Sequence, residues 1–269
     1  MNLKSTRNPF LYIGGVLSAV MVALIVMGYF WTPYNPTAME SAKFLPPSWE
    51  HLLGTDNFGR DIFSRVIDGA GTTFFIAVCV VAIGCVAGVI IGSLCGYYGG
   101  VPDLILTRVC DSITAFPAFL LALVIVSVAG SGTYNIILAL GILFIPSFAR
   151  IVRGEFARCR ELNYTKSAKL MGAGDLRIMF RHILPNTFPV LLSAITIGFN
   201  NAVLSEASMS FLGIGVQPPS ASLGSMLSDS QTYLRSAPWY ALGTGGAIIL
   251  LILGFSLLSE GLQKSARRD

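Results

Sequence analysis

Charged side chains are scarce in this sequence. Of its 269 residues, 12% are aspartate, glutamate, lysine or arginine, about half the share found in ordinary soluble domains. Hydrophobic residues make up 54% of the chain. Several apolar runs are about 20 residues long, which is enough to cross a bilayer. The composition argues against a soluble globular protein and predicts an all-α membrane protein.

The chain also lacks the residue patterns of nucleotide-dependent and metal-dependent enzymes. It has no G-x-x-x-x-G-K-[ST] phosphate-binding loop, and none of its five lysines follows a glycine. Its two histidines and five cysteines form no metal-binding pattern. There is no G-x-S-x-G elbow either. We predict no catalytic residue, no metal site and no cofactor in this chain, so any ATP would be hydrolysed by another subunit.

Six apolar runs predict six membrane-spanning helices. They are Phe10–Phe30, Phe74–Gly96, Leu104–Ala129, Tyr134–Ile151, Thr187–Leu212 and Trp239–Leu258. Lys4 and Arg7 precede the first run, as they would in a signal peptide. That run is too long for a signal peptide, so we predict an uncleaved helix.

Basic residues predict how the helices are oriented. With the N-terminus in the cytoplasm, the inner segments hold 14 of the 18 lysines and arginines, and the external segments 31–73 and 213–238 hold four. An excess of basic residues is typical of cytoplasmic loops. We therefore predict a multi-pass protein with both termini in the cytoplasm.

The long cytoplasmic segment 153–186 has the pattern of two short helices joined by a glycine corner. Asn163 is a candidate N-cap of the first helix, and Gly172 lies where a helix end favours a left-handed residue. Asp175 is a candidate N-cap of the second helix, which we predict to end at Pro185. An apolar stripe is predicted on the second helix at Leu176, Met179, Phe180 and Ile183.

Two interpretations of this segment are open from its residues alone. Its basic residues fit a role in orientation and in attraction to anionic lipid. Two capped helices with a fixed corner also fit a docking surface for a partner. The sequence at 166–172 and 182–185 resembles the E-A-A-x3-G-x9-I-x-L-P loop of permease subunits in bacterial ABC importers, with Lys166 in place of the glutamate and Ser167 in place of the first alanine.

Three further blocks extend this resemblance over nearly the whole chain. Residues 51–70, 96–117 and 204–219 are similar to blocks of the shorter permease in the dipeptide, oligopeptide and nickel branch of the family. The resemblance implies a type I ABC importer permease fold with six membrane-spanning helices. It also implies an N-terminal unit, residues 1–73, that joins the first helix to a periplasmic segment, and a core, residues 74–269.

In that family the cytoplasmic loop is a coupling loop that docks on an ATPase. Applied to this chain, the resemblance implies that segment 153–186 docks through Lys166, Ser167, Ala168, Gly172, Ala173, Gly174, Asp175, His182 and Pro185. It further implies a second homologous permease in a heterodimer, two cytoplasmic ATPases that bind ATP and Mg²⁺, and a periplasmic or lipid-anchored substrate-binding protein. The assembly would lie in the bacterial inner membrane, in contact with lipid, with no nucleic-acid partner. The implied substrate is a dipeptide, an oligopeptide, nickel or a metal chelate.

Polar and ionisable residues within the apolar runs predict a translocation pathway. The candidates are Asp111, Pro117, Asn200, Asn201, Glu206 and Ser210. A structural ion pair with Arg108 is the alternative for Asp111, and hydrogen bonding between helices is the alternative for Glu206. Pro117 is also predicted to kink the third run.

An amphipathic helix that lies on the membrane surface is predicted within residues 59–70 of the external segment. Its apolar face would consist of Ile62, Phe63, Val66 and Ile67.

Two rival functions are weighed against the importer. An ion-gradient-driven secondary transporter of small solutes more often contains inverted repeats with broken helices, and we find none in the sequence. A membrane-embedded enzyme would need a catalytic constellation, which the sequence also lacks.

Overall fold

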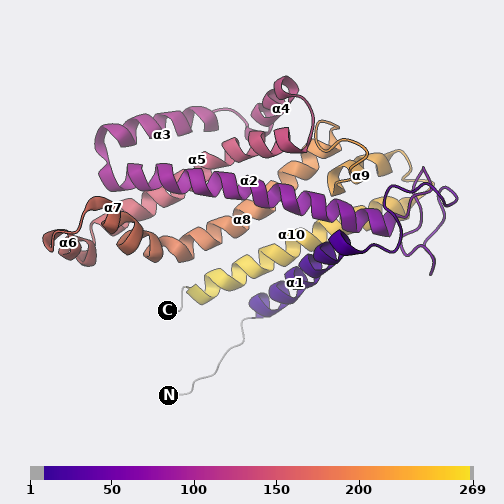
Figure 1. The fold of residues 1–269 in the computed structure, drawn as a ribbon, viewed down its shortest axis with the longest axis horizontal. Helices are drawn as coiled ribbons and strands as arrows, with labels where there is room; N and C mark the ends of the chain where they lie inside the picture. Colours follow the sequence, from indigo (N-terminus) through magenta and orange to yellow (C-terminus); the bar gives the residue numbers. More distant parts are fainter. Residues whose placement is uncertain (1–8, 267–269) are drawn as a thin grey trace, which may run out of the picture.

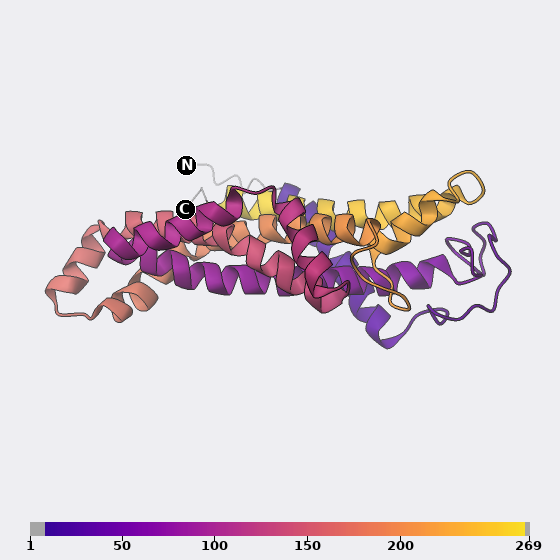
Figure 2. The ribbon, with the colours of Figure 1, turned by 90° about the horizontal axis from the view of Figure 1, so that it is seen from above.

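The computed structural model describes residues 9–266, which form an elongated bundle of helices (Figure 1). The helices α6 and α7 lie at one end of the long axis, and α9 lies with segment 31–61 at the other end (Figures 1 and 2). The elements are α1 (Pro9–Phe30), α2 (Ile62–Tyr98), α3 (Gly100–Thr114), α4 (Ala118–Ala129), α5 (Thr133–Arg160), α6 (Asn163–Leu170), α7 (Asp175–Arg177), a π-helix (Ile178–Ile183), α8 (Leu184–Phe211), α9 (Leu223–Gln231) and α10 (Pro238–Ala266). Lys4 and Arg7 lie outside the described residues.

Five helices within residues 9–266 are long and apolar enough to cross a membrane, and α3 with α4 would make a sixth crossing. The predicted third span, Leu104–Ala129, is wrong as a single helix, because α3 and α4 meet at an angle of 84°. Pro117 lies at this break and precedes the first residue of α4. Proline has no N–H to donate and disfavours helical conformation in the residue before it, so the chain bends here. The predicted kink at Pro117 is confirmed.

The second span begins earlier than its apolar run suggests. Asp61 caps α2, and its Oδ2 accepts a hydrogen bond from the Ser64 N–H at 2.7 Å. The surface helix predicted within residues 59–70 is wrong, because Ile62, Val66 and Ile67 are buried in the first turns of α2. Residue 73, where the sequence suggests a division into two units, lies inside this continuous helix.

Helices α2 and α5 pack closely along most of their length (Figure 1). The face of α2 that makes this contact carries a glycine at every fourth position: Gly84, Gly88, Gly92 and Gly96. A β-carbon on Gly88 would lie 2.9 Å from the Ala149 backbone nitrogen, too close for any side chain. In lipid, helices associate through such close approach at small residues, so this ridge holds α2 against α5.

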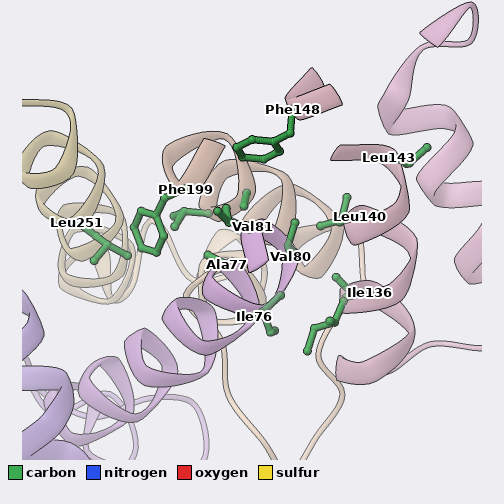
Figure 3. Close-up of a cluster of buried hydrophobic side chains, with 14 of the residues drawn as sticks. Ile76, Ala77, Val80, Val81, Ile136, Leu140, Leu143, Phe148, Phe199 and Leu251 are labelled. Carbon is green, nitrogen blue, oxygen red and sulfur yellow. The ribbon is translucent and has the colours of Figure 1, made fainter. Parts of the chain in front are cut away.

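Part of the core lies where α2, α5, α8 and α10 meet, in the middle of the bundle (Figure 3). Ile76 and Val80 of α2 point toward Ile136 and Leu140 of α5. Phe199 of α8 lies between α2 and α10. On the other side of the molecule α1 pairs with α10, again through glycines that leave no room for a β-carbon. The packing of α2, α5 and α8 against one another fixes α5 and α8, which lead into and out of segment 153–186.

Candidate functional site

The corner between α6 and α7 is a helix end closed by its own backbone. Gly172 has φ of +83°, and its N–H donates to the Lys169 carbonyl at 3.0 Å. The Ala173 N–H donates to the Ala168 carbonyl at 3.1 Å, which completes a Schellman motif. The left-handed conformation predicted for Gly172 is confirmed. The corner turns the chain back toward the bundle.

The helix boundaries around the corner differ from the sequence prediction. Leu162 and Gly174 are the N-caps, and Asn163 and Asp175 are the first helical residues. Pro185 does not end a helix, because it lies in the first turn of α8 and the chain stays helical from residue 175 to 211. The π-helix Ile178–Ile183 directly precedes α8, so the N–H that Pro185 lacks falls where the helix changes from π to α turns.

The predicted apolar stripe is also wrong. Ile178, Met179 and Ile183 are fully buried, whereas Leu176 and Phe180 are exposed. The cause is the π-helix, whose wider turns shift the register of the side chains between α7 and α8.

Hydrogen bonds attach segment 153–186 to the bundle. The Tyr97 hydroxyl of α2 donates to Asp175 Oδ1 at 2.6 Å, and Arg160 Nη1 donates to the Tyr97 carbonyl at 3.0 Å. The Thr165 hydroxyl donates to the Cys159 carbonyl at 2.8 Å. Ala168 is buried on the inner side of α6. With the buried π-helix, these contacts hold the segment in one orientation.

The outward side of the segment is apolar at its tip and basic beside it. Leu170 is 89% exposed and Met171 81% exposed, and Leu176 and Phe180 are exposed next to them. Contiguous exposed apolar side chains on a folded surface mark an interaction site. The other predicted docking residues, Lys166, Ser167, Gly174 and Pro185, are exposed, and Ala173 and His182 are half-buried.

Glu161 stands at the base of this surface. Its carboxylate lies 3.4 Å from Lys166 Nζ and accepts a hydrogen bond from Arg160. These two cations hold the pKa of Glu161 below its usual range. The carboxylate offsets part of the basic charge of the segment.

A cavity of about 340 Å³ opens on the side of the bundle, between α4, α5 and α8. Its lining is mostly apolar, and Ser147, Asn201 and Ser205 supply the polar groups. Of the six residues predicted for a pathway, Asn201 lines this cavity and the others do not. Asn200, its neighbour, instead donates to Ser256 Oγ at 2.8 Å and links α8 to α10.

Glu206 and Ser210 lie inside the bundle. Glu206 is fully buried, and its Oε1 accepts a hydrogen bond from the Ser210 hydroxyl at 2.6 Å. Ser210 Oγ accepts in turn from the Val216 N–H at 3.1 Å. The pair holds the end of α8 against the chain that leads to α9.

Asp111 lies on the exposed surface of α3. Its Oδ1 is 3.3 Å from Arg150 Nη2 of α5, so the predicted partner Arg108 is wrong. Asp103 of α3 binds Arg153 of α5 in a two-pronged ion pair. Two ion pairs therefore attach α3, which buries none of its side chains, to α5.

The sequence patterns did not predict a polar network that lies at the end of the molecule away from α6 and α7. Asp56 Oδ1 accepts from the N–H groups of Phe58 and Arg60, and its Oδ2 accepts from Arg60 Nε at 2.6 Å. His51 Nδ1 lies 2.9 Å from Asp61 Oδ1. The cluster of charged residues in the block 51–70 is the sequence feature that could have indicated this network.

A long helical bundle with an exposed, braced segment at one end and a lateral cavity is the architecture of a membrane transport subunit. The chain belongs to the family of binding-protein-dependent transport system inner membrane components, whose profile matches residues 88–268. It is thus an all-α membrane protein with the type I permease fold of ABC importers.

Curated relatives cover most of the chain. A dipeptide transport system permease protein, DppC, of Haemophilus influenzae is 38% identical over 257 residues, 93% of this chain and 87% of the relative. DppC of Alkalihalophilus pseudofirmus is 40% identical over 259 residues, 96% of this chain and 85% of the relative. A glutathione transport system permease protein, GsiD, of Pectobacterium atrosepticum is 38% identical over 254 residues, 92% of this chain and 84% of the relative.

A solved structure matches the fold. A chain of the MetNI methionine ABC transporter, determined in inward-facing conformations, aligns with a TM-score of 0.56. The alignment covers 77% of this chain and 95% of that chain at 19% identity. It supports the arrangement of the helices.

Proposed function

We propose that this chain is one permease subunit of an ATP-driven importer of dipeptides or oligopeptides. Two of the relatives described above are named for dipeptide transport and one for glutathione transport, itself a peptide. The bundle has a cavity that opens to the side between α4, α5 and α8, so a second homologous permease would complete the pathway as a heterodimer. Asn201 is the residue that we assign to this pathway first.

The proposed partners bind at the two ends of the bundle. Two cytoplasmic ATPases bind ATP and Mg²⁺ and dock at segment 153–186, so this chain needs no catalytic residue or cofactor of its own. A periplasmic or lipid-anchored binding protein delivers the solute at the end formed by α9 and segment 31–61. Both termini would then be cytoplasmic, in accord with the distribution of basic residues. We retain the division into an N-terminal unit 1–73 and a core 74–269 as part of this proposal.

The observation that carries the proposal is the tip formed by Leu170, Met171, Leu176 and Phe180. These four side chains are exposed to solvent, where an apolar surface is unfavourable unless a partner covers it. The segment beneath them is braced by the Tyr97–Asp175 hydrogen bond and by the buried π-helix. A displacement of the tip by a closing ATPase would therefore pass into α5 and α8 rather than bend the loop.

The test is Gly172→Asp in the complete transporter. An L-residue in the left-handed region costs about 1–2 kcal/mol, and the new carboxylate would face the apolar docking surface. We expect the ATPases to be lost on purification and ATP-driven uptake to fall to background. Gly130→Asp is the matched control, because Gly130 is a left-handed glycine at the end of α4, far from the loop in sequence. Normal uptake by Gly172→Asp would overturn the assignment of the loop.

A further inference from the structure

A second cavity, of about 620 Å³, opens at the end of the molecule opposite the cytoplasmic segment. Its walls come from segment 31–61, the first turn of α2, residues 213–220 and α9. Small-molecule sites commonly have volumes of about 300–1,000 Å³, with a few polar groups that converge. The charged residues that line this cavity are Arg60, Arg65 and Asp229.

Arg65 is a charged side chain that the protein buries without satisfying. The residue is 4% exposed, and it lines the cavity. Its Nε has no hydrogen-bond partner among the described residues, and the nearest carboxylate oxygen, Asp56 Oδ2, lies 3.7 Å away. A buried guanidinium usually makes several hydrogen bonds, because an unpaired buried donor is costly.

Asp56 does not satisfy Arg65, because its Oδ2 lies 3.7 Å from Arg65 Nε, beyond hydrogen-bond distance. Oδ1 accepts two backbone N–H groups, and Oδ2 accepts Arg60 Nε. Asp56 therefore balances charge beneath the cavity while Arg60 takes its hydrogen bonds. Because Nε is itself buried, an acceptor that enters the cavity lined by Arg65 would meet the Nη end of the guanidinium.

The part of the cavity lining that comes from α9 carries a negative charge. Asp229 of α9 lines the same cavity and lies close enough to Arg65 and Arg60 to feel their positive charge. A cavity with a cation on one wall and an anion on the other matches a small zwitterion better than a simple anion.

We propose that this cavity is an entry subsite for the transported solute, in which Arg65 binds a carboxylate and Asp229 faces an ammonium group. The proposal rests on the proposed function and adds the residues that recognise the charged ends of a short peptide. A carboxylate on a protein partner would have to reach a side chain that is almost fully buried, whereas a free dipeptide can enter the cavity whole.

The experiment measures binding to the purified complex of permeases and ATPases in nanodiscs, without a binding protein. The probes are alanyl-alanine, its C-terminal amide and its N-acetyl derivative, titrated by saturation-transfer NMR. We expect alanyl-alanine to bind about tenfold more tightly than the amide, the scale of one charge-assisted hydrogen bond. Arg65→Gln should abolish that difference, and Asp229→Asn should abolish the preference for the free amine over the acetylated one.

Arg235→Gln is the control, because Arg235 is exposed in the same external region and does not line the cavity. Arg65→Lys keeps the charge, so it should retain part of the preference if Arg65→Gln does not fold. Equal affinity of the wild type for the dipeptide and its amide would overturn the proposal, as would an unchanged preference in Arg65→Gln.

Failure of this subsite is distinguishable from failure of the proposed function. ATP-driven uptake by the wild type tests the importer and does not depend on which residue binds the carboxylate. Uptake without any carboxylate preference at the permease would refute the subsite alone.

Discussion

The hydrogen bond between Tyr97 and Asp175 is the shortest link between the cytoplasmic corner and the core of the bundle that we describe. It joins α2 to the first residue of α7, 78 positions apart in the chain. Sequence patterns do not indicate such a bond, because neither residue lies in a local motif that requires the other. Asp175 appeared in the sequence as an N-cap, and its observed role depends on the packing of α2 against the loop.

Removal of this bond should weaken coupling without unfolding the bundle. A hydrogen bond to a charged group contributes about 1.5–3 kcal/mol, so Tyr97→Phe should loosen the corner and reduce ATP-driven uptake several-fold. Hydrogen exchange at residues 165–177 should rise in the same variant. Tyr98→Phe is the control, because the Tyr98 ring packs beside Tyr97 and is half exposed. Unchanged uptake and hydrogen exchange in Tyr97→Phe would show that ring packing, which both substitutions preserve, braces the loop without the hydrogen bond.

Asp229 provides a pH test at the residue scale. The surrounding protein desolvates its carboxyl and raises the pKa of Asp229, and Arg65 and Arg60 oppose this rise only in part. A carboxyl whose pKa is raised in the folded state favours folding when protonated, and that contribution is lost as the pH rises through the folded-state pKa. Asp229→Asn should therefore raise the thermal unfolding temperature at pH 7, and the gain should vanish below the ordinary pKa of aspartate. A lower unfolding temperature at pH 7 would contradict this.

At the scale of elements, the glycine ridge of α2 decides how closely the two longest-packed helices approach. The apolar run in the sequence predicted the position of α2. It did not predict the start at Ile62, because the polar residues Ser64, Arg65 and Thr73 interrupt the apolar pattern there. Two of them, Ser64 and Thr73, are buried because polar groups meet them: Ser64 Oγ accepts from the Tyr34 N–H at 3.1 Å, and Thr73 Oγ1 accepts from the Leu223 N–H at 3.2 Å. Hydropathy alone cannot anticipate such partners.

A bulky residue on the ridge should separate α2 from α5. Overpacking of a core typically costs about 1–3 kcal/mol, and backbone contact at Gly88 leaves little room for relaxation. We expect Gly88→Val to lower the thermal unfolding temperature in detergent and the yield of folded protein. Gly15→Val is the control, because a β-carbon at Gly15 of α1 meets open space. An unfolding temperature for Gly88→Val equal to that of the control would contradict a role of the glycine ridge in holding α2 against α5.

The cytoplasmic segment marks the limit of local sequence rules. The corner at Gly172 was predictable, since a glycine after a short helix closes it in a known way. The stripe on the second helix was not, because a π-helix changes the spacing of buried residues and arises from the fit of Ile178, Met179 and Ile183 to the core. Polarity in the sequence selected Glu206 and Asn201 equally as pathway candidates. Only the packing of the helices shows that Glu206 is buried and that Asn201 lines a cavity.

At the scale of the whole molecule, the two ends of the bundle differ in chemistry. One end presents an apolar tip with basic neighbours, and the other encloses a network of Asp56, Arg60 and Arg65 beside a cavity. The helices α2, α5 and α8 run between these ends and share one core (Figure 3). A movement imposed at the tip thus has a continuous packed route to the end where solute would enter.

Uptake into proteoliposomes that contain the complete purified complex, with the binding protein loaded with a labelled dipeptide, would decide whether this chain serves an ATP-driven importer. ATP is enclosed in one set of vesicles, and an ion gradient without ATP is imposed on the other. We expect uptake only into the vesicles that enclose ATP. Uptake driven by the gradient in the absence of ATP would contradict it and would favour a secondary transporter.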